Sequence, residues 1–331
     1  MSRDISVAIP VYNAARYVTL AVTSALQQPE TAEVILVEDG SADNSLEVCQ
    51  ALAGEEKRVR LYRHPGGENR GAATSRNLGM EKSASNLIAF LDADDFYLPG
   101  RFSTAVSILE AHPECDGVYE TLGIQFDSEP ARQRWAAAHK SMNMTGVDRE
   151  VLPQDLFRTL VEGRSGHIHL NTLVIRRRIL EKSGEMDVSL VSMHEDIDFV
   201  WRLAAVGRLL PGRLTEPVAV RRVHEENRIS APRSPERIFR ERMKAWMATY
   251  RWCRRNHLRE QQELVFERML AACIGTKPCQ PHWIESMPPA LRKAWRFVSW
   301  PIDYPEVLLE PGYWKKLFSP ALIFLKGRPE G

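Results

Sequence analysis

Residues 87–95, Leu87-Ile88-Ala89-Phe90-Leu91-Asp92-Ala93-Asp94-Asp95, run an apolar strand directly into three carboxylates. Acidic side chains this close together repel one another unless a cation lies among them. Mg²⁺ and Mn²⁺ prefer carboxylate oxygens and leave coordination positions open for phosphate and water. The stretch therefore indicates either a divalent metal site next to a phosphate, or an acidic turn in which Asp94 or Asp95 caps a helix.

Around this stretch, the first hundred residues alternate between strand and helix patterns. Apolar runs at 5–11, 32–37, 59–62 and 86–91 predict strands, and helical spacing at 14–28, 45–53 and 71–81 predicts helices between them. The alternation is typical of an α/β fold with a Rossmann-like, mostly parallel sheet flanked by helices. Ligands of such sheets lie beyond the carboxyl ends of the strands. Polar residues occur at three of these ends: Tyr12-Asn13, Glu38-Asp39-Gly40-Ser41 and Asp92 to Asp95.

Beyond residue 110 the pattern is weaker. Residues 167–175 and 217–223 predict strands, 176–183 and 196–206 predict helices, and 238–270 is expected to be helical with an apolar face. Pro232 and Pro235 mark a boundary. We therefore expect a first domain at 1–230 and a basic, mainly helical C-terminal region at 231–331.

Two residues of the first half could bind a nucleotide. The Asp39 carboxylate could accept the imide N–H of uracil, although an Asp-Gly turn explains the same residues. Arg76 lies on the helix that follows the glycine-rich stretch 66–71. Its guanidinium could reach a base or a diphosphate, or it could be an ordinary solvated arginine.

Two acids and a histidine of the second half could take part in chemistry. Glu195 and Asp196 come just before an apolar helix, where the helix dipole favours acids, and Asp196 could also be a general base. His224 could be a further metal ligand or a solvated loop histidine. The neighbouring Arg221 and Arg222 could meet phosphate.

Taken together and in this order, the motifs resemble the inverting glycosyltransferases of family 2, which have the A-type fold and use nucleotide-diphospho-sugars. The matching motifs are Pro10-Val11-Tyr12-Asn13, Val37-Glu38-Asp39-Gly40-Ser41, Asn69-x-Gly71-x-x-x-x-Arg76-Asn77-x-Gly79, Phe90 to Asp95, Glu195-Asp196, and His224 with Ser230. They lie within residues 4–230 and leave out the C-terminal region.

The resemblance implies roles for individual residues. Asp39 and Arg76 would hold the base, and Asp92 would lie near the ribose and diphosphate. The full set of expected donor-binding residues is Pro10, Tyr12, Asn13, Asp39, Arg76, Asp92 and Ala93. The expected ligands of Mn²⁺ or Mg²⁺ are Asp94 and His224, and the expected catalytic residues are Asp196, as general base, and Glu195.

The implied reaction is transfer of a hexose from a nucleotide sugar to a hydroxyl of a saccharide or lipid-linked acceptor, in cell-surface polysaccharide or glycoconjugate synthesis. A UDP-sugar fits Asp39 best. Membrane-embedded processive members carry Gln-x-x-Arg-Trp, whereas Arg134-Trp135 is preceded here by Ala131 and Arg251-Trp252 by Ala248. A single-transfer enzyme is therefore expected.

Two other classes of protein are alternatives. A nucleotidyltransferase normally has a glycine-rich, basic phosphate loop after the first strand, and Pro10-Val11-Tyr12-Asn13 is not one. A non-catalytic nucleotide-sugar sensor or a nucleic-acid-binding scaffold is the other alternative. The acidic first domain argues against nucleic acid as a partner.

Charge is nearly balanced over the chain, at +1, but it is unevenly distributed. Residues 1–230 carry 26 Lys and Arg against 33 Asp and Glu, and residues 231–331 carry 18 against 10. Arginines and lysines alternate with aromatic residues at 246–259, 292–296 and 313–316, which suits peripheral contact with an anionic membrane. A helical subdomain with a solvated basic face would have the same composition.

Other features concern the compartment. Five scattered cysteines without a CxxC pair favour a reducing environment. The first strand begins at Ile5, which leaves no room for a signal peptide, and residues 317–325 are too short to span a membrane. We therefore expect a cytoplasmic location, with association with the inner face of the membrane as a further option.

Overall fold

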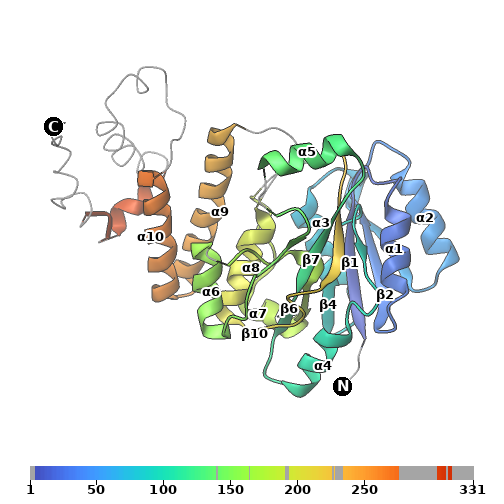
Figure 1. The fold of residues 1–331 in the computed structure, drawn as a ribbon, viewed down its shortest axis with the longest axis horizontal. Helices are drawn as coiled ribbons and strands as arrows, with labels where there is room; N and C mark the ends of the chain where they lie inside the picture. The colour runs from blue at the N-terminus through green and yellow to red at the C-terminus, as the bar shows by residue number, and fades with distance from the viewer. Residues whose placement is uncertain are drawn as a thin grey trace. The chain divides into compact units, whose positions relative to one another are not determined.

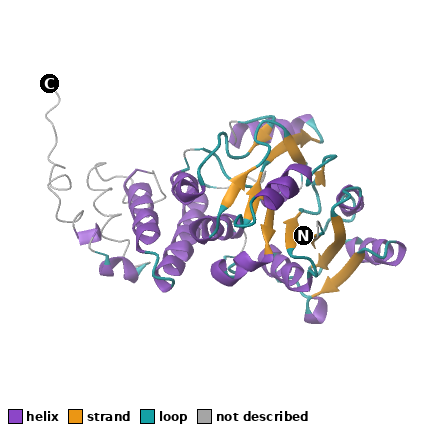
Figure 2. Cartoon of the chain, turned by 90° about the horizontal axis from the view of Figure 1, so that it is seen from below, coloured by secondary structure: helices purple, strands orange, loops and turns teal. Residues whose placement is uncertain are grey.

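The computed structural model describes residues 4–138, 141–163, 165–190, 194–225, 227, 234–275, 304–310 and 312–314. Contacts between Cα atoms divide the chain into two compact units, Met1–Pro232 and Arg233–Gly331. The first unit is a layered α/β structure in which helices flank a central sheet (Figure 1). Strands and helices of this unit are distinguished by colour in Figure 2.

The central sheet has seven strands in the order β10-β6-β9-β4-β1-β2-β3. Its members are β1 (Ile5–Val11), β2 (Thr31–Glu38), β3 (Val59–Arg63), β4 (Leu87–Phe90), β6 (Gly117–Tyr119), β9 (Leu173–Arg176) and β10 (Leu209–Pro211). β1 pairs in parallel with β2 and β4, and β2 pairs in parallel with β3. β9 runs antiparallel to β4 and to β6. The mostly parallel sheet predicted from the sequence is confirmed.

The central parallel strands β1, β2 and β4 are mostly apolar and buried, and helices cover both faces of the sheet. Val7, Ile9, Val34, Leu36 and Ala89 are fully buried in one hydrophobic cluster. Such continuous apolar runs are what a doubly covered parallel sheet requires. Burial of this cluster fixes the strand register, and the register decides which polar residues meet at the carboxyl edge.

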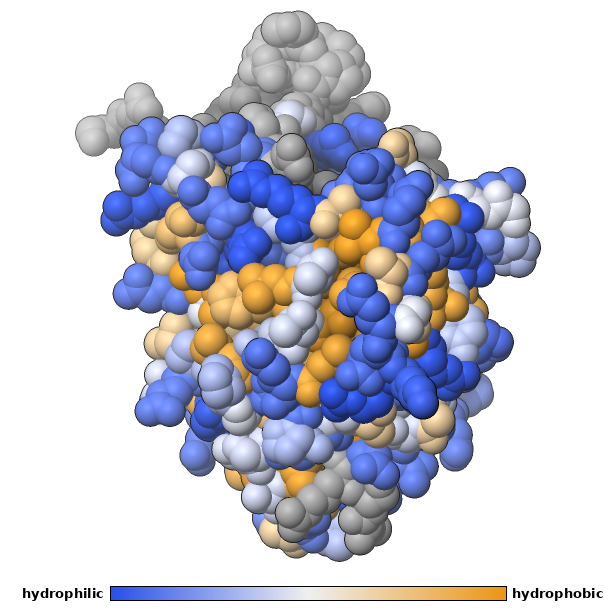
Figure 3. Space-filling model, turned by 90° about the vertical axis from the view of Figure 1, so that its right-hand side faces the viewer, coloured by the Kyte–Doolittle hydropathy of each residue, from blue (hydrophilic) through white to orange (hydrophobic). Residues whose placement is uncertain are grey.

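The helices of the first unit alternate with its strands along the chain. They are α1 (Val18–Leu26), α2 (Ser45–Glu55), α3 (Ala72–Lys82), α4 (Ser103–Ala111), α5 (Glu129–Ala138), α6 (Pro153–Glu162), α7 (Leu180–Ser183) and α8 (Glu195–Val206). Small residues let α3 approach the sheet, since a Cβ added at Gly79 would lie 2.9 Å from the Cβ of Ala8 on β1. Figure 3 shows the face on the side of α1 and α2, where apolar side chains gather in the middle of a hydrophilic surface.

A second, four-stranded sheet, which the sequence did not predict, brings the acidic stretch next to a late part of the chain. Its order is β5 (Phe96–Tyr97), β11 (Pro217–Val223), β7 (Thr121–Phe126) and β8 (Met144–Thr145). β5 directly follows Asp95 and pairs antiparallel with β11, with Phe96 opposite Val220. Because β11 ends at Val223, His224 emerges beside the acids.

Several expected elements have different bounds. The helix predicted over 14–28 begins only at Val18, and of the strand predicted over 167–175 only Leu173 onwards is extended, after a short 3₁₀ helix at Leu170–Thr172. The helical structure predicted over 238–270 is confirmed except for a short break. The second unit has two helices there, α9 (Pro235–Arg255) and α10 (Arg259–Gly275), separated where His257 adopts a φ of 58°.

The two tryptophans of α9 are buried, whereas its arginines are exposed. Trp246 is 5% exposed and Trp252 is 8% exposed, whereas Arg251, Arg254 and Arg255 are exposed. Among the described residues, no helix has the length and apolar character that crossing a membrane requires. The basic segments 292–296 and 315–316, together with Ser230, lie outside the described residues.

Candidate active site

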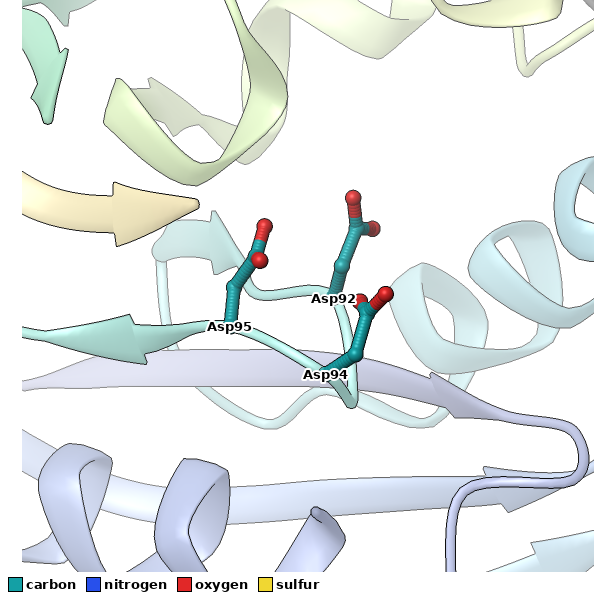
Figure 4. A group of neighbouring side chains, drawn as sticks. All are labelled: Asp92, Asp94 and Asp95. Atoms are coloured by element: carbon teal, nitrogen blue, oxygen red, sulfur yellow. The ribbon is translucent and has the colours of Figure 1, made fainter. Parts of the chain in front are cut away.

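The three acids after β4 form a tight turn at the carboxyl edge of the sheet. The N–H of Leu91 still donates to Ala8 O (3.1 Å), and the N–H of Asp95 then donates to Asp92 O (3.0 Å) and closes the turn. One oxygen from each of Asp92, Asp94 and Asp95 lies within 4.8 Å of the others. In Figure 4 the three side chains leave the turn toward the same side. The crowding inferred from the sequence is present.

Asp92 is paired with the arginine predicted to bind the donor. Arg76, on α3, donates to Asp92 Oδ1 across 2.6 Å, and its other terminal nitrogen lies 3.5 Å from Glu195 Oε1. Burial is the largest single effect and disfavours ionisation of Asp92, but the positive charge of Arg76, its hydrogen bond and smaller contributions from neighbouring groups together outweigh burial and lower the pKa of Asp92 to about 2. Asp92 is therefore a carboxylate at neutral pH.

The same arginine brings the first turn of α8 into the site. Burial lowers the pKa of Arg76, but the negative charges of Asp92, Glu195 and Asp196 raise it above its ordinary value. Glu195 is buried, whereas Asp196 is partly exposed and its Oδ1 accepts the N–H of Ile197 at 2.8 Å. The acidic turn and the start of α8 thus belong to one cluster of charges, although they are about a hundred residues apart.

Asp94 meets His224, as expected for the two residues predicted to bind a metal. Asp94 Oδ2 lies 3.2 Å from His224 Nε2 and accepts a hydrogen bond from Asn227 Nδ2 at 2.8 Å. The His224 ring packs on Tyr17, with 4.6 Å between the ring centroids. A carboxylate oxygen and an imidazole nitrogen are ligands that suit Mn²⁺, and about a third of the Asp94 side chain (32%) is exposed. This pair fits the expected metal.

Asp95 differs from the other two acids because it is buried and its oxygens are engaged by the protein. Asn171 Nδ2 donates to Asp95 Oδ2 at 2.6 Å, and the N–H of Arg222 donates to Asp95 Oδ1 at 2.8 Å. Burial raises the pKa of Asp95 well above its ordinary value, and the neighbouring charges of Asp94 and Asp92 raise it further.

Asp39 organises the glycine-rich loop that precedes α3. Its two carboxylate oxygens accept the N–H groups of Arg70 (2.7 Å) and Gly71 (2.9 Å), and it is only 3% exposed. Gly40, at φ 69°, allows a close approach, since a Cβ there would lie 2.7 Å from Asn69 N. Asp39 thus holds the distant glycine-rich loop through its carboxylate, which is a different role from the local Asp-Gly turn considered from the sequence, and its contact with a base stays a prediction.

The remaining predicted donor residues lie on the loop after β1 and on the acidic turn. Asn13, at φ 50°, ties two loops together: its N–H donates to Ser41 Oγ (3.0 Å) and its Oδ1 accepts the N–H of Ala42 (2.8 Å). Tyr12 is 51% exposed, whereas Ala93 is buried. Pro10 is half-buried near the carboxyl end of β1.

Sequence reasoning missed a set of buried polar residues behind the acidic turn. Asn171 is fully buried and accepts the N–H of Asp92 at 3.0 Å. Arg101 donates to Asn171 O (3.1 Å) and forms a fully buried ion pair with Glu120 at 2.7 Å. Burial and the charge of Arg221 lower the pKa of His169 well below its ordinary value, so this histidine is neutral. The available signal was the set of polar residues His167, His169, Asn171 and Thr172 within the expected strand 167–175.

The fold agrees with that of a solved glycosyltransferase. The chain aligns with the crystal structure of S. aureus TarS 1-349 in complex with UDP-GlcNAc at a TM-score of 0.62 and 16% identity, over 98% of this chain and 87% of that one. The α/β fold is therefore the A-type glycosyltransferase fold. The chain belongs to glycosyl transferase family 2, whose family model matches residues 6–183.

Curated relatives match part of the chain more closely. Succinoglycan biosynthesis protein ExoU of Rhizobium meliloti is 43% identical over 205 residues, which are 62% of this chain and 58% of that protein. The glycosyltransferase YibD of Escherichia coli is 37% identical over 222 residues, which are 65% of this chain and 60% of that protein. The chain thus matches about three fifths of the length of these two relatives.

Proposed function

We propose that this chain is an inverting, single-transfer glycosyltransferase that moves a hexose from a nucleotide-diphosphate donor, preferably a UDP-sugar, to a hydroxyl of a saccharide or lipid-linked acceptor. The proposal depends most on one observation: Arg76 contacts both Asp92 and Glu195. The positively charged guanidinium of this buried arginine therefore brings the acidic turn and the start of α8 together. Such a cluster at the carboxyl edge of the sheet is where this fold binds ligands. The similarity to a succinoglycan biosynthesis protein supports a role in polysaccharide synthesis.

In the proposed mechanism, residues of this chain bind the donor and move one proton. Asp94 and His224 would hold Mn²⁺ or Mg²⁺, which when bound neutralises charge on the departing nucleoside diphosphate. Asp196 takes the proton of the acceptor hydroxyl while that oxygen attacks the anomeric carbon. The bond to the diphosphate breaks on the opposite face of the sugar, so the configuration at this carbon is inverted. Glu195 holds Arg76 beside Asp92.

Thermal unfolding in the presence of nucleotide sugars tests the donor and the metal without knowledge of the acceptor. A ligand that binds only the folded protein raises its melting temperature. We expect stabilisation by a UDP-sugar in the presence of Mn²⁺, and much less without the metal. Asp94→Asn should lose the Mn²⁺-dependent part. Glu47→Gln, on the exposed side of α2, is a matched control that should behave as the wild type.

The outcomes of this experiment separate the proposal from its alternatives. Stabilisation by free nucleoside triphosphates and not by any nucleotide sugar would favour a nucleotidyltransferase. Equal stabilisation of the wild type and Asp94→Asn at every Mn²⁺ concentration would remove Asp94 from the metal site. No response to any member of the panel would contradict the proposed donor class.

We also propose peripheral contact of the C-terminal region with anionic lipid, at the inner face of the cytoplasmic membrane. Exposed arginines on α9 support this proposal, whereas burial of Trp246 and Trp252 supports a helical subdomain with a solvated basic face. Sedimentation with anionic vesicles at low and high salt distinguishes lipid contact from a helical subdomain with a solvated basic face. Binding that is lost in Arg251→Glu/Arg254→Glu/Arg255→Glu supports lipid contact, and no sedimentation in the wild type contradicts it.

A further inference from the structure

Asn171 joins the two ends of the acidic turn. Its Oδ1 accepts the N–H of Asp92 at 3.0 Å, and its Nδ2 donates to Asp95 Oδ2 at 2.6 Å. Only one orientation of the amide satisfies both groups, because the reverse would set its NH₂ against an N–H and its oxygen against a carboxylate. The side chain is fully buried, so water cannot replace either partner.

Asp95 connects the acidic turn to β11 by a second hydrogen bond. Its second oxygen accepts the N–H of Arg222 at 2.8 Å. Two residues later the chain reaches His224, whose Nε2 lies 3.2 Å from Asp94 Oδ2. Asp94 and His224 therefore lie on two backbone segments that Asn171 and Asp95 connect, one the acidic turn and the other the end of β11.

Hydrogen bonds to neighbouring residues hold the backbone of Asn171 in place. Arg101, which is fully buried, donates to the carbonyl oxygen of Asn171 at 3.1 Å, and Glu120 holds Arg101 at 2.7 Å. The N–H of Asn171 donates to His169 Nδ1 at 3.2 Å. The amide is thus anchored to the region between the two sheets and is not carried by a free loop.

We infer that Asn171 and Asp95 are positioning residues that hold Asp94 and His224 opposite each other, and that Asp95 is not itself a metal ligand. The inference rests on the proposed function, because it presumes that Asp94 and His224 bind the cation. Both oxygens of Asp95 already accept hydrogen bonds from the protein, whereas Asp94 has about a third of its side chain exposed. Residues that orient metal ligands typically contribute 10- to 100-fold to metal affinity.

An exchange of the two side chains tests this directly. Asn171→Asp alone places two carboxylates against each other, and Asp95→Asn alone sets two NH₂ groups against each other. In the double variant Asn171→Asp/Asp95→Asn, the new Asp accepts the N–H of Asp92 and an N–H from the new Asn, whose oxygen accepts the N–H of Arg222. All three hydrogen bonds are then restored, with one reversed in direction.

The measurement is the dissociation constant of Mn²⁺ in the presence of UDP, followed by the electron paramagnetic resonance signal of free Mn²⁺. We expect each single variant to bind Mn²⁺ about 10- to 100-fold more weakly, and the double variant to recover to within a few-fold of the wild type. Asn143→Asp, at an exposed position, controls for the added charge and should bind as the wild type. Melting temperatures of all variants are recorded in parallel.

Each outcome decides the inference. If Asp95 were a ligand, the double variant would stay as weak as Asp95→Asn, because an amide then occupies position 95. If the network only supported the fold, the single variants would melt at lower temperature with an unchanged Mn²⁺ constant. Failure of the proposed function has a different signature, since wild-type protein would then show no UDP-dependent Mn²⁺ binding at all, and the metal-positioning role would fall with it.

Discussion

Arg76 is the residue on which the charge balance of the site depends. It is 7% exposed and faces carboxylates from two separate elements, Asp92 on the acidic turn and Glu195 on α8. Breaking a buried ion pair by removing one partner typically costs about 3–5 kcal/mol, because the other charge stays buried. Asp92 and Glu195 retain some solvent contact, so the lower end of this range applies here.

The stability of the protein should therefore depend on the ionisation of Asp92. The folded-state pKa of Asp92 is depressed to about 2, below its ordinary value of 3.8. The stability gained from this ion is present above the ordinary pKa and is lost as the pH falls toward the folded-state pKa. We expect the difference in unfolding free energy between the wild type and Asp92→Asn to shrink between pH 5 and pH 2.5 in urea titrations. When Arg76 is replaced by Met, the effect of Asp92→Asn on the unfolding free energy should depend less on pH. An equal pH dependence with Arg76 and with Met at position 76 would contradict the pairing of Asp92 with Arg76.

Asp196 and Glu195 should differ in what their substitution removes. Asp196→Asn should abolish most transfer, by the factor of about 10² to 10⁴ that general bases typically contribute, while UDP-sugar binding stays nearly intact. Glu195→Gln should weaken donor binding more strongly than Asp196→Asn does, because Glu195 forms the ion pair with Arg76. Donor affinity by calorimetry and turnover with acceptor separate the two. Unchanged turnover in Asp196→Asn would remove the assignment of the base.

At the scale of elements, the close approach of α3 to β1 sets the position of Arg76. A methyl group at Gly79 would lie 2.9 Å from the Cβ of Ala8, so Gly79→Ala forces the helix to shift. We expect a loss of about 1–3 kcal/mol in unfolding free energy, the usual cost of overpacking. Ala8→Gly should recover part of this loss in the double variant.

Gly54 on α2 provides the matched control for this substitution. No atom lies within 4 Å of a Cβ added there, so Gly54→Ala should be neutral or stabilise the protein by up to about 1 kcal/mol. A full double-mutant cycle of Ala8 and Gly79 measures the contact itself. Additive effects of Ala8→Gly and Gly79→Ala would show that the two residues do not pack against each other.

The elements predicted from the sequence are those with local signals. β1, β2 and β4 are mostly apolar runs and β3 alternates apolar and polar residues, so their positions could be predicted from the sequence. α3 follows a glycine-rich stretch and α8 has acids in its first turn, which are local signals of a helix start. The second sheet could not be predicted, because β5 and β8 have two residues each and β11 pairs with strands about a hundred residues away. The break after α9 occurs at Asn256-His257 without a proline or glycine.

Only those residues of the candidate site that lie in recognisable sequence motifs could be predicted. Asp94 and His224 were paired through the resemblance to a family, and the structure brings them within 3.2 Å. The buried residues Asn171, Arg101 and Glu120 lie outside those motifs, and their roles depend on contacts between strands of two sheets. Such tertiary contacts leave no periodic pattern in the sequence.

At the scale of the whole molecule, charge and fold divide the chain in the same region. The acidic first 230 residues carry the A-type fold and the candidate site, and the basic remainder includes α9 and α10. The match to glycosyl transferase family 2 covers residues 6–183 and stops before α8 and His224. The proposed base and one proposed metal ligand therefore lie beyond the part that the family model covers.

Crystals grown with a UDP-sugar and Mn²⁺, measured at the manganese absorption edge, would locate both the metal and the donor. We expect an anomalous difference peak within bonding distance of the Asp94 carboxylate and the His224 imidazole. We also expect the diphosphate to lie beyond the carboxyl ends of β1, β2 and β4. A peak bound by Asp95 in place of Asp94, or a nucleotide seated away from Arg76 and Asp92, would contradict the proposed site.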